Sequence, residues 1–240
     1  MLAWKPTPSL ARQAAASALG QIGDAQATQA LLRAGKDDSP EVRRAAIEAL
    51  GRVGDGMAIE VLVNALKDRY PEVRYEAIKA IGEIGDVRAI KPLAAVYRDS
   101  QGNDDKFILA IARTVEVLAT NGKPGALEAL IAVVQEYDGA ARSLAGRVLV
   151  KLGSAAIEPL CSLLNSSDST VRYAAVQALG KIGGVQAVRP LSIALMDSDY
   201  QVYASALESL AQMGEAAIDP LVDLLDQPGE KERMGVCAGL

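Results

Sequence analysis

One pattern of residues returns along the chain at intervals of about thirty-one residues. A single position of the pattern holds, in turn, Arg12, Arg43, Arg74, Ile111, Arg142, Arg172, Tyr203 and Arg233, at steps of 31, 31, 37, 31, 30, 31 and 30 residues. One repeat of this length cannot bury its apolar side chains alone and gains a core only by packing on its neighbours. The pattern therefore predicts a stack of similar repeats.

Each repeat contains two patterns typical of amphipathic helices. In the second repeat, Val42, Ala46 and Leu50 follow the spacing of one helix face, and Gly54 stands where a left-handed residue can end a helix. A second apolar pattern occupies residues 58–66 of the same repeat. No segment has the pattern of a strand, so the sequence predicts an all-α chain.

The aligned repeats cover residues 8–38, 39–68, 69–99, 100–136, 137–167, 168–197 and 198–227, with a partial repeat at 228–240. We predict an α-α superhelix of about seven helix pairs plus this partial repeat, in a single domain over residues 1–240. Leu240 aligns with Leu50, so the last repeat has a first helix and no second one. That helix either caps the stack or continues into a longer array. The longer array is favoured because Val236 and Cys237 would otherwise lose half of their cover.

One column within the first helices holds glycine in several repeats, at Gly20, Gly51, Gly82 and Gly180. Glycine inside a helix costs about 1 kcal/mol relative to alanine. We interpret the column as a place where helices approach closely, so that packing offsets the lost helix propensity.

The full pattern reads Asp-x-x-Val-Arg-x-x-Ala-x-x-Ala-Leu-Gly-x-Ile-Gly-Asp-x-x-Ala-Ile-x-Pro-Leu, and residues 42–55, 73–86 and 171–183 follow its first half well. It resembles the HEAT-like repeat of the phycobilisome-lyase type over residues 8–240, nearly the whole chain. The resemblance implies a HEAT-like solenoid, in which helix pairs stack in one dimension and the second helices line a concave face.

The composition excludes several kinds of site. The chain contains no histidine, which removes histidine-based triads, imidazole proton shuttles and His-ligated metals. Its formal charge is −5 and its aromatic content is 4%, and neither suits a surface for phosphates or stacked bases. We therefore predict no cofactor, no metal and no nucleic-acid partner.

Cysteine usage and the first residues indicate the compartment. Cys161 and Cys237 lie 76 residues apart outside any paired framework, as is common for reduced thiols. The first residues lack the apolar core of a signal peptide, and no stretch is long and apolar enough to span a bilayer. We expect a cytoplasmic protein without membrane contact. Cys161 falls in an apolar column with Val63, so we interpret it as a small core residue.

The arginine column predicts a structural ladder whose members are Arg12, Arg43, Arg74, Arg142 and Arg172. Aspartates follow the first helices at Asp24, Asp55 and Asp86. We expect each guanidinium to bond a carboxylate or loop carbonyls of the preceding repeat. The alternative is a row of anion-binding groups. Ile111 and Tyr203 replace the arginine in two repeats, and there we expect weaker contacts between neighbouring repeats.

Exposed positions on and beside the second helices are the predicted docking residues for another protein. They are Glu60, Asn64, Arg88, Lys91, Arg98, Glu128, Glu158, Arg189, Asp219 and Asp223. We expect a concave groove of mixed charge, more basic around Arg88, Lys91 and Arg98 and more acidic at Asp219 and Asp223. The fourth repeat also inserts six residues around 100–106. Either this extra loop has no role, since loop length costs little entropy, or it is a contact loop or a bend in the solenoid.

Two functions are weighed on these observations. The preferred one is a non-catalytic scaffold with a protein partner, because the sequence holds no nucleophile elbow, phosphate loop or metal-ligand cluster. The alternative, implied by the resemblance, is a subunit of a phycobilin lyase or a phycobilisome-processing factor. The resemblance extends to deoxyhypusine hydroxylase, which holds iron with His-Glu pairs that this sequence lacks. It also extends to DNA glycosylases, whose basic DNA-binding face the acidic composition disfavours.

Overall fold

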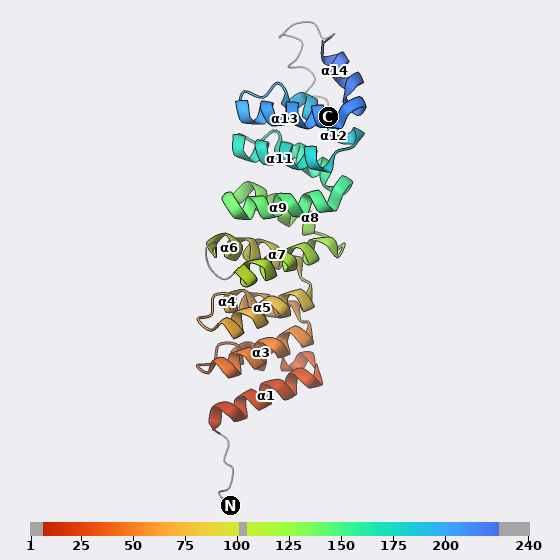
Figure 1. The fold of residues 1–240 in the computed structure, drawn as a ribbon. Helices are drawn as coiled ribbons and strands as arrows, with labels where there is room; N and C mark the ends of the chain where they lie inside the picture. The colour runs from red at the N-terminus through yellow and green to blue at the C-terminus, as the bar shows by residue number, and fades with distance from the viewer. Residues whose placement is uncertain (1–6, 101–104, 226–240) are drawn as a thin grey trace, which may run out of the picture. The chain divides into compact units, whose positions relative to one another are not determined.

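A computed structural model describes residues 7–100 and 105–225, and all regular structure in these ranges is helical. The α-helices are α1 (Pro8–Ile22), α2 (Thr28–Ala34), α3 (Pro40–Val53), α4 (Ile59–Ala65), α5 (Pro71–Ile84), α6 (Ile90–Asp99), α7 (Asp105–Thr120), α8 (Ala126–Glu136), α9 (Gly139–Leu152), α10 (Ile157–Leu163), α11 (Ser169–Ile182), α12 (Val185–Ala194), α13 (Tyr200–Met213) and α14 (Ile218–Leu225). Within the described ranges they form seven consecutive pairs (Figure 1), which confirms the predicted all-α repeat architecture. The predicted partial repeat at 228–240 lies outside the described residues.

Two of the described first helices, α1 and α3, begin with a capping side chain followed by proline. The hydroxyl of Ser39 accepts a hydrogen bond from the backbone N–H of Val42 at 3.4 Å, and Pro40 is the first residue of α3. Thr7 and Pro8 repeat this arrangement at α1. The side-chain oxygen satisfies an amide that has no partner within the helix, and proline has no amide hydrogen to satisfy. These residues therefore determine where the helix starts.

A short 3₁₀ turn connects many first helices to the second helix of the pair. The turns are η1 (Ala25–Ala27), η2 (Gly56–Ala58), η3 (Val87–Ala89), η4 (Gly153–Ala156) and η5 (Gly214–Ala217). Before η2, Gly54 has a φ of 74°, a left-handed conformation that glycine adopts without a Cβ clash, and donates its N–H to the carbonyl of Leu50. Asp55 then accepts the N–H of Met57 at 2.9 Å and begins the turn.

The chain divides into two compact units, an N-terminal unit of residues 1–148 and a C-terminal unit of residues 149–240. The division falls inside α9, so α1 to α8 belong to the N-terminal unit and α10 to α14 to the C-terminal unit. The proposed boundaries of the individual repeats, and a single domain over the whole chain, stay predictions.

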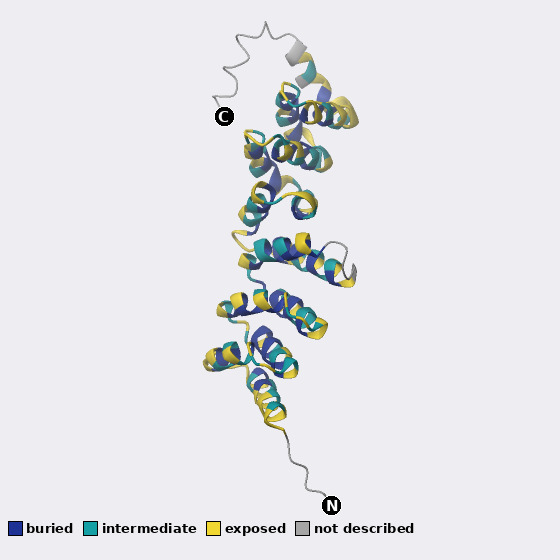
Figure 2. Cartoon of the chain, turned by 90° about the vertical axis from the view of Figure 1, so that its left-hand side faces the viewer, coloured by how far each residue is buried: buried dark blue, intermediate teal, exposed yellow. Residues whose placement is uncertain are grey.

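The core of the N-terminal unit lies between successive helix pairs. In this unit α1 packs on α3, α3 on α5 and α5 on α7, while α2, α4 and α6 each pack on the first helix of the following pair. Figure 2 shows buried positions on successive helices. Leu50, Leu62, Ile81, Leu93 and Ile111 are completely buried in these layers. Full burial of such a side chain contributes about 1.5–3 kcal/mol. Each repeat therefore depends on its neighbours for most of its cover.

The C-terminal unit is built in the same order. In this unit α10 packs on α11, α11 on α13, and α12 on both α11 and α13, with α14 against α12. Leu179, Leu191 and Val202 are completely buried between these helices. The repeated sequence pattern thus produces the same nearest-neighbour packing in both units.

Three of the four glycines in the predicted column stand at close helix contacts. A Cβ placed on Gly20 would lie 2.7 Å from the Cα of Ala49, and one on Gly51 would lie 2.9 Å from the Cα of Ala80. A Cβ on Gly180 would lie 2.7 Å from that of Ser209. Gly82 differs, because the nearest atom to its Cβ position is 3.8 Å away, which is ordinary contact. Close approach therefore explains the column at every member except Gly82.

We predict opposite effects for two equivalent glycine substitutions. Gly51→Ala should lower the free energy of unfolding by about 1–3 kcal/mol, because the new methyl group forces α3 away from the backbone of α5. Gly82→Ala is the matched control, and should raise it by about 0.5–1 kcal/mol through helix propensity alone. Urea denaturation followed by far-UV circular dichroism measures both, and equal effects would contradict the packing interpretation.

Candidate functional site

The predicted docking residues of the N-terminal unit lie on or beside its second helices. Glu60 and Asn64 are exposed on α4, Arg98 on α6 and Glu128 on α8. Arg88 is exposed on η3, and Lys91 at the start of α6 is half-buried. These side chains therefore reach solvent, while the concave form of the surface stays a prediction.

The predicted docking residues of the C-terminal unit follow the same column. Glu158 is exposed on α10, Arg189 on α12 and Asp219 on α14. The side chain of Asp223 lies outside the described part of the structure. The exposed residues of this unit carry both signs of charge, as the sequence indicates.

The basic stretch expected around Arg88, Lys91 and Arg98 is largely neutralised by internal contacts, which corrects the sequence-based picture. The Nζ of Lys91 lies 2.6 Å from a carboxylate oxygen of Glu136, and Arg98 lies 2.8 Å from the carboxylate of Asp99. The third basic residue, Arg88, pairs with Asp86 and donates to the carbonyl of Gly56 at 3.0 Å. A partner would have to compete with these contacts to use the three positive charges.

A hollow between α2 and α4 is a better candidate within the same face. It has a volume of about 280 Å³ and is lined by Gln29, Leu32, Arg33, Lys36, Met57, Glu60 and Val61. Met57 is 60% exposed there, although it is apolar. No ion pair within the described residues engages Arg33 or Lys36. The hollow thus joins an exposed apolar side chain to two positive charges that are available to a partner.

Sequence reasoning missed Met57 and Lys36 as site residues. A signal for Met57 is present, because the same column holds the polar residues Gln26, Arg88 and Gln186 in other repeats. The remaining repeats hold Gly125, Ala155 and Ala216 there, so Met57 is the one long apolar side chain in the column of seven aligned repeats, which indicates an exposed contact. Lys36 gives no comparable signal, since lysine at the end of a helix is common.

The arginine ladder joins two successive loops. Nε and Nη2 of Arg43 donate to the carboxylate of Asp68 at 2.7 and 2.9 Å, and Nη1 donates to the carbonyls of Asp37 and Asp38. The carboxylate partner therefore comes after the second helix of the same repeat. The expected carbonyls of the preceding loop are present, but the carboxylate lies in the following loop instead.

The two hydrogen bonds from Nε and Nη2 to one aspartate carboxylate form a planar fork. The same fork occurs at two other arginines of the column. Arg12 bonds Asp37 through Nε and Nη2 at 2.7 and 2.9 Å, and Arg172 bonds Asp197 at 2.7 and 2.8 Å. Each of these aspartates also accepts a backbone N–H two residues later, where the next first helix is about to begin. The fork thus fixes the start of one repeat to the start of the next.

The aspartates that follow the first helices have another role. Asp24, Asp55 and Asp86 each accept a backbone N–H two residues later and begin a 3₁₀ turn. Asp55 also accepts the hydroxyl of Thr28 at 3.1 Å, and so links adjacent repeats. The described contacts of these three aspartates do not include an arginine of the column, so the expected bonds to the preceding repeat are made to its loop carbonyls instead.

Two members of the predicted ladder make other contacts with the described residues. Arg142 donates from Nε to the carbonyl of Val134 at 2.8 Å. Arg74 donates from Nη1 to the carbonyls of Asp68 and Arg69, and its guanidinium lies 5.3 Å from the centre of the Phe107 ring. Arg74 therefore keeps the loop-carbonyl contacts of the ladder, whereas Arg142 contacts a carbonyl in the last turn of α8.

The forks change the acidity of their carboxyl groups. The hydrogen bond from Arg12 lowers the pKa of Asp37, and that from Arg172 lowers the pKa of Asp197. Burial opposes ionisation of Asp68, but the hydrogen bonds from Arg43 and the backbone of Tyr70 outweigh it and lower the pKa of this carboxyl too. All three groups are therefore held in the ionised form that the fork requires.

Cys161 is half-buried on α10. Burial, together with the negative charge of Glu158, raises the pKa of its thiol above the ordinary value. The protonated thiol is a weak nucleophile and a poor metal ligand.

Among the described residues, no cluster of three or more His, Cys, Asp or Glu side chains could hold a metal ion. None of the described helices has both the length and the apolar character that a bilayer crossing needs.

Two models of known protein families match parts of this chain. The family model described as HEAT repeats matches residues 33–112, 128–211 and 157–240, which is well over half of the chain. The model described as the PBS lyase HEAT-like repeat matches residues 11–34. The chain therefore belongs to the HEAT repeat family. Among curated proteins, no sequence matches it.

Solved structures with a similar arrangement of helices include proteins of diverse function. The complex of CpcE and CpcF of phycocyanin lyase from Nostoc is 22% identical, with 94% of this chain and 96% of that chain covered and a TM-score of 0.43. An archaeal HEAT-like repeat protein from Thermococcus onnurineus is 13% identical, with coverage of 89% and 100% and a TM-score of 0.47. Human deoxyhypusine hydroxylase is 22% identical, with coverage of 88% and 82% and a TM-score of 0.39.

Removing the guanidinium from the fork should destabilise the N-terminal unit. In the Arg43–Asp68 pair the side chains are only 13% and 10% exposed, so Arg43→Gln leaves a charged, nearly buried carboxylate without its guanidinium donor. We expect a loss of about 1.5–3 kcal/mol in the free energy of unfolding, measured by urea denaturation. Arg12→Gln is the matched control and should cost clearly less, because the Arg12 side chain is 50% exposed. An equal loss in both variants would contradict the role of burial.

The same pair should make stability depend on pH. Because the pKa of Asp68 is lowered by folding, its stabilisation is complete above the unfolded value of about 3.9 and disappears as the pH falls through the folded pKa. The free energy of unfolding of the native protein should therefore drop below about pH 5, and less steeply in Asp68→Asn. Urea titrations between neutral and acidic pH measure this difference, and parallel curves for the two proteins would refute it.

Proposed function

We propose that this chain is a non-catalytic scaffold that binds a protein partner through the second-helix face of its N-terminal unit. The observation that supports this proposal is the hollow between α2 and α4, where the exposed Met57 stands beside Arg33 and Lys36. HEAT repeats hold such a face in a fixed form without any ligand, because each layer is packed on the next. A partner can then bind without the loss of conformational entropy that ordering this surface would require.

The chemistry of the hollow indicates what kind of segment would bind it. Met57, Leu32 and Val61 offer an apolar contact, and methionine adapts its shape to an incoming side chain. Arg33 and Lys36 favour acidic residues on either side of that contact. We therefore expect an apolar side chain flanked by Asp or Glu in the partner.

The other predicted docking residues have a secondary part in this proposal. Glu60 lines the hollow and Asn64 lies one helical turn further on α4, so both extend the contact. Lys91 would first have to leave Glu136, which reduces its net contribution to binding. Arg189, in the C-terminal unit, is exposed and lies outside the hollow.

The lyase alternative has one observation in its favour, which is the match of the PBS lyase HEAT-like repeat to residues 11–34. Against it, the full sequence holds no histidine, and the raised pKa of Cys161 makes this thiol a weak nucleophile toward a bilin. Incubation of the purified chain with a bilin and an antenna protein tests the alternative. Formation of a coloured covalent adduct would overturn the non-catalytic proposal.

Substitution in the hollow should abolish partner binding without harming the fold. Because Met57 is exposed, Met57→Asp should leave the unfolding free energy nearly unchanged while it places a negative charge where an acidic segment binds. In affinity capture from an extract of the native cells, we expect the partner to be lost with Met57→Asp and with Arg33→Glu/Lys36→Glu.

The matched control for this experiment reverses charges elsewhere on the predicted surface. Lys91→Glu/Arg189→Glu should reduce capture only weakly, because Lys91 is already paired with Glu136. Capture that survives the substitutions in the hollow, and disappears with this control, would place docking on another part of the face.

A further inference from the structure

Comparison between repeats reveals an arginine whose fork has no carboxylate. Asp68 stands 25 residues after Arg43, and by the same spacing Asp99 should serve Arg74. In the structure Asp99 instead accepts from Nε and Nη2 of Arg98 at 2.9 and 2.8 Å. Arg74 uses Nη1 for two loop carbonyls, as Arg43 does, and no carboxylate in the described part of the chain meets its remaining donors.

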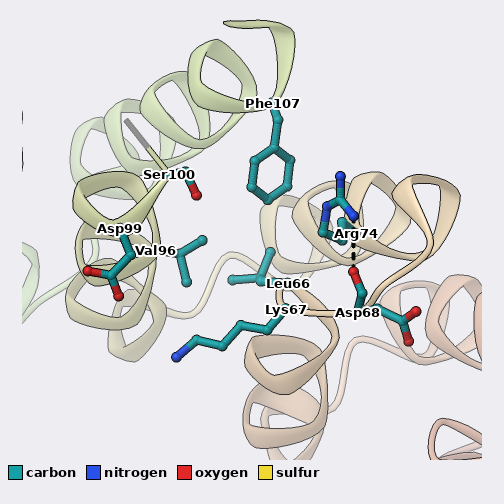
Figure 3. A pocket seen from close by; sticks show the side chains of 8 residues that line it. All are labelled: Leu66, Lys67, Asp68, Arg74, Val96, Asp99, Ser100 and Phe107. Atoms are coloured by element: carbon teal, nitrogen blue, oxygen red, sulfur yellow. Dashed lines mark hydrogen bonds between the residues drawn. The ribbon is translucent and has the colours of Figure 1, made fainter. Parts of the chain in front are cut away.

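The guanidinium of Arg74 lies at the wall of a cavity within the N-terminal unit (Figure 3). The cavity has a volume of about 570 Å³ and is lined by Leu66, Lys67, Asp68, Arg74, Val96, Asp99, Ser100 and Phe107. Leu66 and Val96 are buried and form an apolar wall, and the ring of Phe107 lies beside Arg74. The cavity therefore combines an apolar surface with a guanidinium that is held in place.

The charge balance of the cavity favours an anion. Among the described residues that line it, both carboxylates are engaged, Asp68 by Arg43 and Asp99 by Arg98. Two positive groups remain, Arg74 and the exposed Lys67. Three other arginines of the column show that this position binds a carboxylate through Nε and Nη2 as a planar fork.

We infer that this cavity binds an acidic side chain of a partner peptide, whose carboxylate takes the place on Arg74 that Asp68 occupies on Arg43. An apolar residue next to that carboxylate packs against Leu66, Val96 and Phe107. This site lies beside the first helix α5 and not in the hollow between α2 and α4, so it stands independently of the proposed function.

The test uses the full chain labelled with ¹⁵N and the side-chain Nε–Hε signals of its arginines. The probes are the peptides acetyl-Leu-Asp-Leu-amide and acetyl-Leu-Asn-Leu-amide, which differ only in the carboxylate, and inorganic phosphate. We expect the Asp peptide to shift the Arg74 signal saturably, with a dissociation constant on the order of 1 mM, and the Asn peptide to leave it unchanged. Absence of that signal in Arg74→Lys assigns it.

Two variants separate binding from folding. Lys67→Gln changes an exposed side chain and should leave the fold intact. It should weaken the binding of the Asp peptide about threefold to tenfold, because one positive charge is lost. Arg74→Gln removes the reporting signal, so its binding is followed through the backbone amide signals of α5, which the Asp peptide should shift in the native chain and not in this variant; circular dichroism shows whether its helices remain. If Arg74→Gln fails to fold, the titration of the native chain and of Lys67→Gln still decides the matter.

Three outcomes would overturn the inference. In the first, neither peptide shifts the Arg74 signal of the native chain. In the second, phosphate shifts it and the Asp peptide does not, which indicates a phosphate site. In the third, the Asp peptide binds only after Asp104→Asn/Asp105→Asn, which means that the chain supplies the carboxylate itself.

Discussion

The structure depends on one constraint, which is that a single helix pair of this size cannot bury its own apolar residues. Leu50 on α3 is completely buried only because α1 and α5 pack on either side of that helix. Stability therefore comes from contacts between neighbouring repeats, and every feature that sets their spacing matters. The glycines at Gly20 and Gly51 let helices approach, and the arginine forks hold the loops at the same separation.

Because the apolar layers and the arginine forks stabilise the stack, the remaining surface is available for binding. Apolar side chains face adjacent layers, and the arginine forks use the loop edge, so the outer positions of the second helices carry no part of the core. Met57 and Lys36 can then serve a partner at little cost to the fold. Arg74 keeps the loop contacts of the ladder, and no described carboxylate meets its other donors, so its guanidinium is a candidate binding site.

Much of the fold was predictable because the pattern repeats. Helix pairs, glycine contacts and the arginine column all follow from spacing along the chain, and several repeats show each of them. The contacts of particular side chains were harder to predict. Lys91 meets Glu136 across 45 residues, and Asp99 meets Arg98 in place of Arg74 beside a six-residue insertion. Such pairings depend on where second helices end, which the spacing of apolar residues does not record.

Native-state amide hydrogen exchange on Leu50→Ala tests the central claim most directly. This substitution creates a cavity in α3 and should cost about 2–5 kcal/mol. If stability is a sum of nearest-neighbour contacts, amide protection should fall in α1, α3 and α5 and persist in α13, which belongs to the other unit. An equal loss of protection in all helices, α13 included, would contradict the account.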